Sequence, residues 1–303
     1  MATTSDLPLS WERINCARPH FLTVPLRIHK TNWFSLAEIP ESWDFEPALN
    51  EMKKLSPGGI VIRGCNKEIA GFLKNHDFQC IQIAMEALLR LNGEHFKKKS
   101  VKNLIKRGLR HGTIKEIEYN SENHERILAL KKKTPHGNKP QLKYLFRTDF
   151  EETTRCFVFE RHAQEWLGAI TISKINFEKY QTEMLLRFAG APVGVMESLI
   201  YNVFIRLKEE NYRFWSLGEV PFVGINSRGG NMKEKLIKSG TPLFTYAYNY
   251  KTLYAFKNKF APLWEKIYIC GYPKITYRTL WDIFIKSNFL HLILSPQGKK
   301  SKI

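Results

Sequence analysis

The sequence predicts an α/β protein with mixed, mostly antiparallel β-sheets. Three observations indicate this class. A glycine turn leads into a short apolar strand at 60–63, and a helical pattern follows at 66–78. The stretch 155–187 alternates like a series of antiparallel strands. It runs directly into a strongly periodic helix at 192–212. Strands and helices that alternate along a chain are typical of a sheet covered by helices.

The N-terminal part is expected to hold short elements and loops. Residues 11–57 are rich in aromatic side chains and contain four prolines: Pro19, Pro25, Pro40 and Pro47. After the helix at 66–78, the stretch 79–91 begins with the alternation of a strand. This order of strand, helix and strand is the start of an α/β unit.

A strongly basic amphipathic helix is predicted at 97–112. One side of a helical wheel carries its apolar residues: Val101, Leu104, Ile105 and Leu109. The other side carries four cations: Lys99, Lys102, Lys106 and Arg110. The fifteen residues before Gly112 contain seven Lys or Arg and no acid. Because like charges four residues apart on a helix repel each other, this face is expected to meet an anion.

The rest of the chain repeats the α/β pattern. We predict a strand at 113–119, a helix at 121–133 and a basic loop at 134–141. Turns are predicted at 162–165 and 176–179, and a buried strand at 213–221. The glycine-rich stretch 226–235 is expected to be a loop. A last helix around Trp281 is expected to pack on the domain ahead of a basic tail, and contact with an anionic membrane surface is the alternative.

The composition favours an anionic partner and a cytoplasmic location. The 303 residues carry a formal net charge of +18, which suits RNA, DNA, a phosphate-bearing metabolite or an anionic lipid surface. The five cysteines form no C-x-x-C and have no histidine at metal spacing, so we expect reduced thiols and no metal site. We expect neither a secretory signal nor a membrane-spanning helix, which needs ~18 apolar residues.

The stretch RFAGAPVG, where a strand runs straight into a helix, resembles the anion-binding turn of GNAT-type acyltransferases. Free amides and the dipole at a helix N-terminus hold a phosphate or a developing oxyanion. Arg187 and Gly190 fit the CoA-binding pattern, but Pro192 stands where its last small residue belongs. Proline has no N–H to offer a pyrophosphate, so we expect no CoA and no other cofactor.

Three stretches resemble the C-terminal catalytic region of the phosphatidylglycerol lysyltransferases, also called aminoacyl-phosphatidylglycerol synthases. APVGVMESL is similar to the family's Ala-Pro-Asn-Gly-Thr-Met-Asp-x-Leu, and YRFWSLGEVP to its strand ending Leu-Gly-x-x-Pro. LYAFKNKFAPLWEKIY is similar to its Leu-x-x-Phe-Lys-x-Lys-Phe-x-Pro-x-Trp block. The order and spacing of these stretches agree with the family between residues 72 and 268. Glu197 departs from the pattern by replacing the usual Asp.

The resemblance implies two tandem GNAT-like domains, 1–96 and 113–303, joined by the basic helix at 97–112. It also implies an enzyme that moves an aminoacyl group from aminoacyl-tRNA to a hydroxyl of a lipid such as phosphatidylglycerol. The residues expected to bind tRNA phosphates are Lys98, Lys99, Lys102, Lys106, Arg107 and Arg110. The family's membrane-spanning N-terminal region is not expected here, so the acceptor, a peripheral membrane contact and the oligomeric state stay open.

Acyl transfer needs a carboxylate for the aminoacyl ammonium, a proton acceptor, and donors for the oxyanion. Glu197, in the first turn of its helix, is a candidate base or ammonium contact; the alternative is an acid favoured only by the helix dipole. Glu219 follows a buried strand, and the alternative is a solvated loop carboxylate. Arg187 is a candidate clamp for a phosphate or oxyanion. Gly190 and Glu183 are further candidates for substrate binding.

Lys257 and Lys259 are expected to act together near the reacting ester. Residues i and i+2 share a face in a strand, whereas in a helix they diverge by about 160°. If the segment is extended, both ammonium groups point at the oxyanion or a phosphate, and solvated lysines on an apolar strand are the alternative. Trp264 is counted with the substrate-binding residues, with burial in the core as the alternative.

Two other functions stay open at this point. One is a CoA-dependent GNAT N-acyltransferase, against which Pro192 argues. The other is a non-catalytic RNA-binding or lipid-binding protein on a tandem GNAT scaffold. The presence of Arg187, Glu197, Lys257 and Lys259 together favours catalysis.

Overall fold

The structure is a computed structural model that describes residues 6–27, 31–225, 232–234 and 249–295. One mixed sheet has the strand order β1-β3-β4-β11-β5-β10-β9-β8-β7-β6, and β2 pairs with β3 outside this path. The strands are β1 (Glu12–Ile14), β2 (His20–Leu26), β3 (Thr31–Pro40), β4 (Ile60–Cys65), β5 (Gln79–Arg90), β6 (Thr113–Ile117), β7 (Arg155–Arg161), β8 (Glu165–Lys174), β9 (Lys179–Arg187), β10 (Phe214–Pro221) and β11 (Leu263–Tyr272). The helices are α1 (Phe45–Leu55), α2 (Lys67–Lys74), α3 (Lys99–Leu109), α4 (Ser121–Lys132), α5 (Val195–Glu209), α7 (Tyr250–Asn258), α8 (Tyr277–Lys286) and α9 (Phe289–Leu294).

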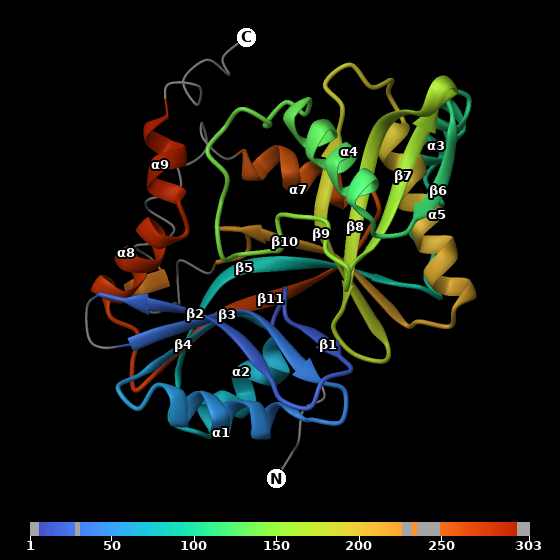
Figure 1. Cartoon of the computed structure of the whole chain (residues 1–303). Coiled ribbons are helices and arrows are strands. Elements are labelled where there is room, and N and C mark those ends of the chain that lie inside the picture. Colours follow the sequence, from blue (N-terminus) through green and yellow to red (C-terminus); the bar gives the residue numbers. More distant parts are fainter. Residues whose placement is uncertain (1–5, 28–30, 226–231, 235–248, 296–303) are drawn as a thin grey trace.

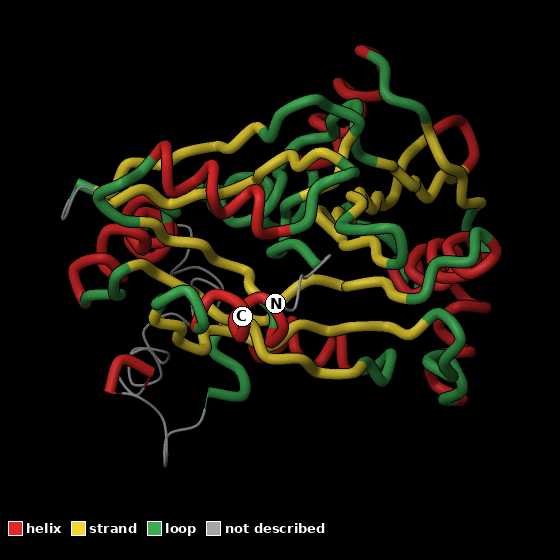
Figure 2. The backbone as a smooth tube through the Cα atoms, turned by 90° about the horizontal axis from the view of Figure 1, so that it is seen from below, coloured by secondary structure: helices red, strands yellow, loops and turns green. Residues whose placement is uncertain are grey.

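The expected class is confirmed, because most strand pairings are antiparallel and the sheet is mixed. The strands run through the middle of the molecule, and helices lie both at its edges and over the strands in the view from below (Figure 2). One large core packs α5 and α3 on the strands of the C-terminal half, and another packs α1 and α2 on β3 and β4. Each half of the strand order thus has its own hydrophobic core between strands and helices.

The last strand along the chain lies among strands from the beginning of the chain. β11 pairs antiparallel with β4 on one side and with β5 on the other (Figure 1). It therefore separates β4 from β5, although these two strands are neighbours in sequence. The division of the chain at 97–112 into two domains stays a prediction.

The expectation of only short elements between residues 11 and 57 is wrong. This stretch contains the ten residues of β3 and the eleven residues of α1. Its prolines occupy positions that regular structure tolerates. Pro25 lies in β2, which pairs only with β3; Pro40 is the last residue of β3; and Pro47 is in the first turn of α1.

Two glycines bring the basic helix α3 into backbone contact with the start of α5. A Cβ atom added to Gly108 would lie 2.2 Å from the carbonyl oxygen of Gly194. A Cβ atom added to Gly194 would lie 2.2 Å from the carbonyl oxygen of Leu104, and its φ of +100° also favours glycine. Val101 and Ile105 are buried on the same side of α3. The two helices are thus fixed at a distance that no larger residue at these positions allows.

Gly108→Ala is expected to lower the free energy of unfolding by about 1–3 kcal/mol, as overpacking does. The reason is the clash of the new methyl group with the Gly194 carbonyl. Gly71→Ala is the matched control, because a Cβ atom there meets nothing within 4 Å. It should leave stability unchanged or raise it by up to ~1 kcal/mol. Urea unfolding measures both, and equal effects of the two variants would contradict the close contact.

Candidate functional site

Glu197 and Lys259 form an ion pair where α5 begins and α7 ends. Lys259 Nζ lies 3.0 Å from Glu197 Oε1. Glu197 is in the first turn of α5, as the sequence predicts, and its side chain is 8% exposed. The Lys259 side chain is 42% exposed, and Nζ lies 5.3 Å from the centre of the Phe256 ring. A nearly buried carboxylate is therefore paired with an ammonium group that an incoming substrate can reach.

Lys257 and Lys259 lie at the end of a helix, so the condition that would aim them together, an extended segment, is not met. Residues 250–258 form α7. Asn249 is its N-cap, and the Asn249 side chain accepts a hydrogen bond from the Thr252 N–H. Ala261, with φ of +48°, and the proline after it end the helical segment before β11. Consecutive side chains on a helix point in different directions, and the two lysines contact different partners.

Lys257 points into the protein. Its side chain is 3% exposed, and Nζ donates a 2.9 Å hydrogen bond to the backbone carbonyl of Glu219. β10 bulges between Ser216 and Glu219, and Gly218 has a φ of +82° there. A Cβ atom at Gly218 would make only ordinary contact with Lys257 Nζ, at 3.4 Å, so it is the positive φ of the bulge that favours glycine here.

Burial lowers the pKa of Lys257 from 10.5 to about 7, although the charges of Glu219 and Glu86 raise it in part. The low polarity around Nζ disfavours the ammonium form. The group is therefore poised between amine and ammonium near neutral pH.

A row of three glutamates crosses the middle of the sheet beside Lys257. Glu265 of β11 and Glu219 of β10 both pair with Glu86 of β5. Glu86 is fully buried, and its Oε1 lies 2.9 Å from Nζ of Lys179. Glu219 forms an ion pair with Arg63 of β4. Its Oε2 is buried and has no hydrogen-bond donor among the described residues.

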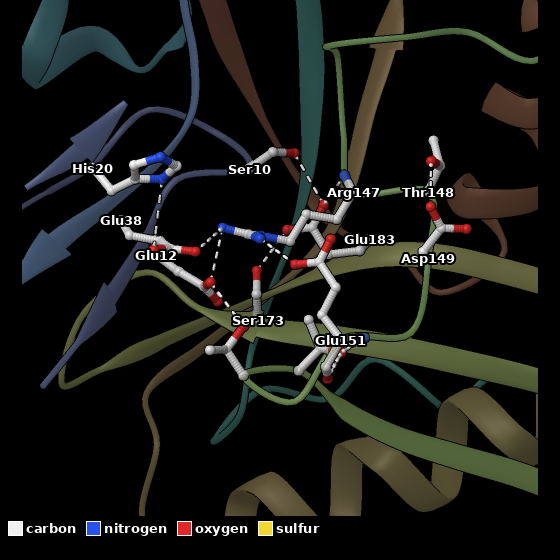
Figure 3. A network of polar contacts seen from close by, with 12 residues as sticks. Ser10, Glu12, His20, Glu38, Arg147, Thr148, Asp149, Glu151, Ser173 and Glu183 are labelled. Carbon is white, nitrogen blue, oxygen red and sulfur yellow. Dashed lines mark hydrogen bonds and ion pairs between the residues drawn. The ribbon is translucent and has the colours of Figure 1, made fainter. Parts of the chain in front are cut away.

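Glu183 is held in a separate buried network (Figure 3). Its Oε2 accepts hydrogen bonds from Ser10 Oγ at 3.0 Å and from the Arg147 backbone N–H at 2.9 Å. Its Oε1 accepts from Ser173 and Gln181. These donors use both oxygens, so the carboxylate ties β8 and β9 to the segment before β1.

Arg147 and Glu12 form a buried ion pair in the same network, with 2.7 Å between Nη2 and Oε1. Burial raises the pKa of Glu12 to about 7, and the Arg147 charge offsets part of that shift. Thr153 also donates to Glu12, at 2.9 Å. The loop that leads into β7 is thereby fixed on β1.

Arg187 and Gly190 lie at the turn between β9 and α5. The Arg187 guanidinium donates to the Ala191 carbonyl, and Gly190 is exposed. The N–H of Ala189 donates to the Lys133 carbonyl, and that of Ala191 to the Phe188 carbonyl. Protein groups already use these two amides of the predicted anion-binding turn.

Trp264 braces α7 against β11. Its ring stacks on Tyr254 with 4.6 Å between centroids, and its Nε1 donates to Asn258 Oδ1 at 3.2 Å.

The structure thus brings Glu197 to Lys259 and Glu219 to Lys257, and α7 joins the two pairs. Within the described ranges, no three His, Cys, Asp or Glu side chains are grouped in a way that could hold a metal ion.

Sequence reasoning missed the charged residues that surround these pairs. They are Glu12, Arg63, Glu86, Arg147 and Lys179. A signal was present in IVIRGC and IAMEALL, where one charged residue interrupts an apolar strand. Such a residue needs a partner inside the protein, because an unpaired buried charge is costly.

The predicted basic face of α3 is present on the surface. All six predicted tRNA-binding residues are exposed, and none has an ion pair among the described residues: Lys98, Lys99, Lys102, Lys106, Arg107 and Arg110. Leu109 differs from the prediction, because its side chain is exposed rather than packed with Val101 and Ile105. The face is a row of unpaired cations on a rigid helix.

The pKa of Lys257 predicts a specific pH dependence of stability. Between about pH 7 and 10.5 the unfolded state binds more protons at Lys257 than the folded state, so this contribution to stability rises with pH and is lost as pH falls through 7. The free energy of unfolding of wild type relative to Lys257→Met should therefore increase by about 1.4 kcal/mol per pH unit across this window.

Denaturant unfolding at several pH values measures that difference. Lys251→Met, at an exposed position of the same helix, is the control for the loss of a lysine from α7, and the increase with pH should be larger for Lys257→Met than for this variant. Equal pH dependence of the two variants would contradict the lowered pKa of Lys257.

Comparisons with known proteins identify the family and support the fold. The family model of the phosphatidylglycerol lysyltransferase C-terminal region matches residues 40–271. The structure of L-PGS from Bacillus licheniformis is similar at a TM-score of 0.68 and 15% identity, covering 89% of this chain and 85% of that chain. The C-terminal domain of a putative lysylphosphatidylglycerol synthetase from Agrobacterium fabrum gives 0.68 at 16% identity, covering 88% and 85%. A structure of FemX gives 0.55 at 10% identity, covering 87% and 85%.

These likenesses confirm the GNAT-like fold class that the sequence predicts. A search of curated proteins found no match. None of the helices within the described ranges combines the length and the hydropathy that a membrane span requires. Since the family model covers most of its length, the chain belongs to the phosphatidylglycerol lysyltransferase C-terminal family.

Proposed function

We propose that this protein transfers an aminoacyl group from aminoacyl-tRNA to a hydroxyl group of a lipid such as phosphatidylglycerol, at the cytoplasmic membrane surface. One observation carries the proposal: α3, with its row of unpaired cations, packs backbone to backbone on the start of α5, which bears Glu197. A polyanion bound to α3 would place its end close to the Glu197–Lys259 pair. Membership in the family supports the lipid acceptor.

The proposed reaction is a transesterification. The acceptor hydroxyl oxygen attacks the ester carbonyl carbon, and Glu197 accepts the hydroxyl proton. The Lys259 ammonium stabilises the oxyanion that forms. The bond to the ribose oxygen then breaks, and Glu197 returns the proton to that oxygen. The 3.0 Å pair holds the ammonium group beside the carboxylate until the substrate enters.

The remaining predicted residues have supporting roles in this proposal. Glu219 has one buried carboxylate oxygen that no donor among the described residues contacts, which suits the aminoacyl ammonium group. Lys257 holds the bulge of β10 that presents Glu219. Arg187 and Gly190 would contact the terminal phosphates of the donor. Glu183 holds β8 and β9 together beside the site, and Trp264 holds α7 against β11.

The turn between β9 and α5 supports a donor other than CoA. Pro192 has no N–H, and the amides of Ala189 and Ala191 are used inside the protein. The Leu104 carbonyl of α3 also lies against Gly194. A pyrophosphate would meet few free amides there.

A label-transfer assay tests the proposal and the role of Glu197 together. Radiolabelled aminoacyl-tRNA is incubated with dispersed phosphatidylglycerol, and label is counted in the organic extract. We expect RNase-sensitive transfer with at least one amino acid. Glu197→Gln should lower kcat at least about 100-fold, because it removes the proton acceptor. No transfer with any amino acid would overturn the proposed function.

Glu209→Gln, at an exposed position near the other end of α5, is the matched control and should transfer at the wild-type rate. Comparing the change in kcat with the change in KM distinguishes the two possible roles of Glu197, as base or as contact for the ammonium group. A rise in KM for aminoacyl-tRNA with kcat unchanged would make Glu197 the contact for the ammonium group instead of the base.

The basic face of α3 should bind tRNA through phosphate contacts. Lys102→Gln with Lys106→Gln is expected to weaken tRNA binding and to reduce the slope of log Kd against log salt by about one per lost contact. Lys67→Gln with Lys74→Gln changes two exposed lysines on α2 and should change neither quantity. Filter binding over a series of salt concentrations measures both pairs. An unchanged slope for the α3 pair would mean that tRNA binds elsewhere.

A further inference from the structure

A stripe of large apolar side chains is exposed to solvent along α8. Tyr277, Trp281 and Ile285 are 45%, 55% and 43% exposed. They recur every four residues, so they span an arc of only about 80° on the helix. Leu294, at the end of α9, is 67% exposed. Four of the large exposed apolar residues in the described part of the chain are thus gathered on two consecutive helices.

The stripe is rigidly presented. Thr276 and Thr279 form a capping box at the start of α8. On the buried side of the helix, Asp282 accepts a 2.6 Å hydrogen bond from the Arg27 N–H. Trp281 stacks on Phe284, with 5.4 Å between ring centroids. The apolar stripe is therefore a face of an anchored helix rather than the surface of a frayed end.

The exposed charged side chains of residues 273–295 are all positive. Lys274 and Arg278 are exposed, Lys286 is half-buried, and none of the three has an ion pair among the described residues. The only acid between residues 273 and 295 is Asp282, which is buried. A partner for this surface must offer an apolar layer and negative charge side by side. The interface of an anionic bilayer does so, and Trp, Tyr, Lys and Arg are the residues that favour it.

The position of the stripe fits the other surfaces of the molecule. Figure 1 shows α8 and α9 on one side and α3 with α5 on the other, so a membrane and a tRNA would not compete for the same face. Aromatic contacts join α9 to the helix that bears the lysines. The ring centroids of Phe289 and Phe222 are 6.2 Å apart, and those of Phe222 and Tyr250, the first residue of α7, are 6.0 Å apart.

We propose that the face of α8 formed by Tyr277, Trp281 and Ile285, with Leu294 of α9, docks on an anionic phospholipid bilayer. The aromatic and aliphatic side chains insert at the level of the headgroups, and Lys274 and Arg278 contact lipid phosphates. The lipid acceptor then reaches the protein from the α7 side, while tRNA occupies α3. The choice of phosphatidylglycerol as the anionic lipid rests on the proposed function; the surface itself does not.

Co-sedimentation of the full chain with vesicles tests the inference without any tRNA. Wild type should bind vesicles of mixed phosphatidylglycerol and phosphatidylcholine, and bind vesicles of phosphatidylcholine alone more weakly. Trp281→Ser with Ile285→Ser should lower the partition coefficient at least about tenfold, because two inserted side chains are lost. Circular dichroism checks that the variant folds.

Phe177→Ser is the matched control. Phe177 is 64% exposed between β8 and β9, and Lys174 Nζ lies 4.9 Å from its ring, but no apolar stripe surrounds it. This variant should bind vesicles like wild type. Equal binding by wild type and the α8 variant, or no binding by either, would overturn the inference. A wild-type dimer that the α8 substitutions dissociate in light scattering would assign the stripe to a second copy of the chain and would also overturn it.

The transfer assay separates this inference from the proposed function. With detergent-dispersed phosphatidylglycerol, the α8 variant should transfer label at the wild-type rate, since docking is not needed. If wild type transfers nothing but its vesicle binding depends on α8, the proposed function fails and the docking surface stands. If transfer occurs and the α8 substitutions do not change vesicle binding, the docking surface fails and the proposed function stands.

Discussion

The contact between Gly108 and Gly194 is the constraint on which the proposed site depends. Because neither residue has a Cβ atom, the backbone of α3 lies directly on the start of α5. That position fixes two things at once: the direction of the basic face and the first turn that carries Glu197. A looser contact would separate the cations from the carboxylate they are proposed to serve.

The second organising feature is charge buried in the sheet. Burying an ionised side chain is costly unless a partner compensates, and here the partners come from distant strands. Arg63 of β4 reaches Glu219 of β10, and Lys179 of β9 reaches Glu86 of β5. Such pairs add little net stability, but loss of one partner would leave the other charge unpaired. They therefore specify which strands come together.

Local pattern predicted the elements better than their contacts. The antiparallel strands at 155–187, the helix at 195–209 and the basic face of α3 follow from periodicity, because each is determined by residues close in sequence. The local pattern leaves the segment around Lys257 open, because its aromatic residues suit either a strand or a helix, and in the structure it is a helix capped by Asn249. The partners of Glu12, Glu86 and Glu219 depend on strand order, which no local pattern contains.

The position of β11 has a consequence for how the chain folds during synthesis. β4 and β5 are made early, but each pairs with β11, whose last residue is Tyr272. Until that strand leaves the ribosome, both early strands have an unpaired edge that can pair with another chain. Contacts between such distant residues also slow folding, because a long loop must close first. The nascent chain thus depends on β11, and a chaperone that covers these edges would protect it until β11 has been made.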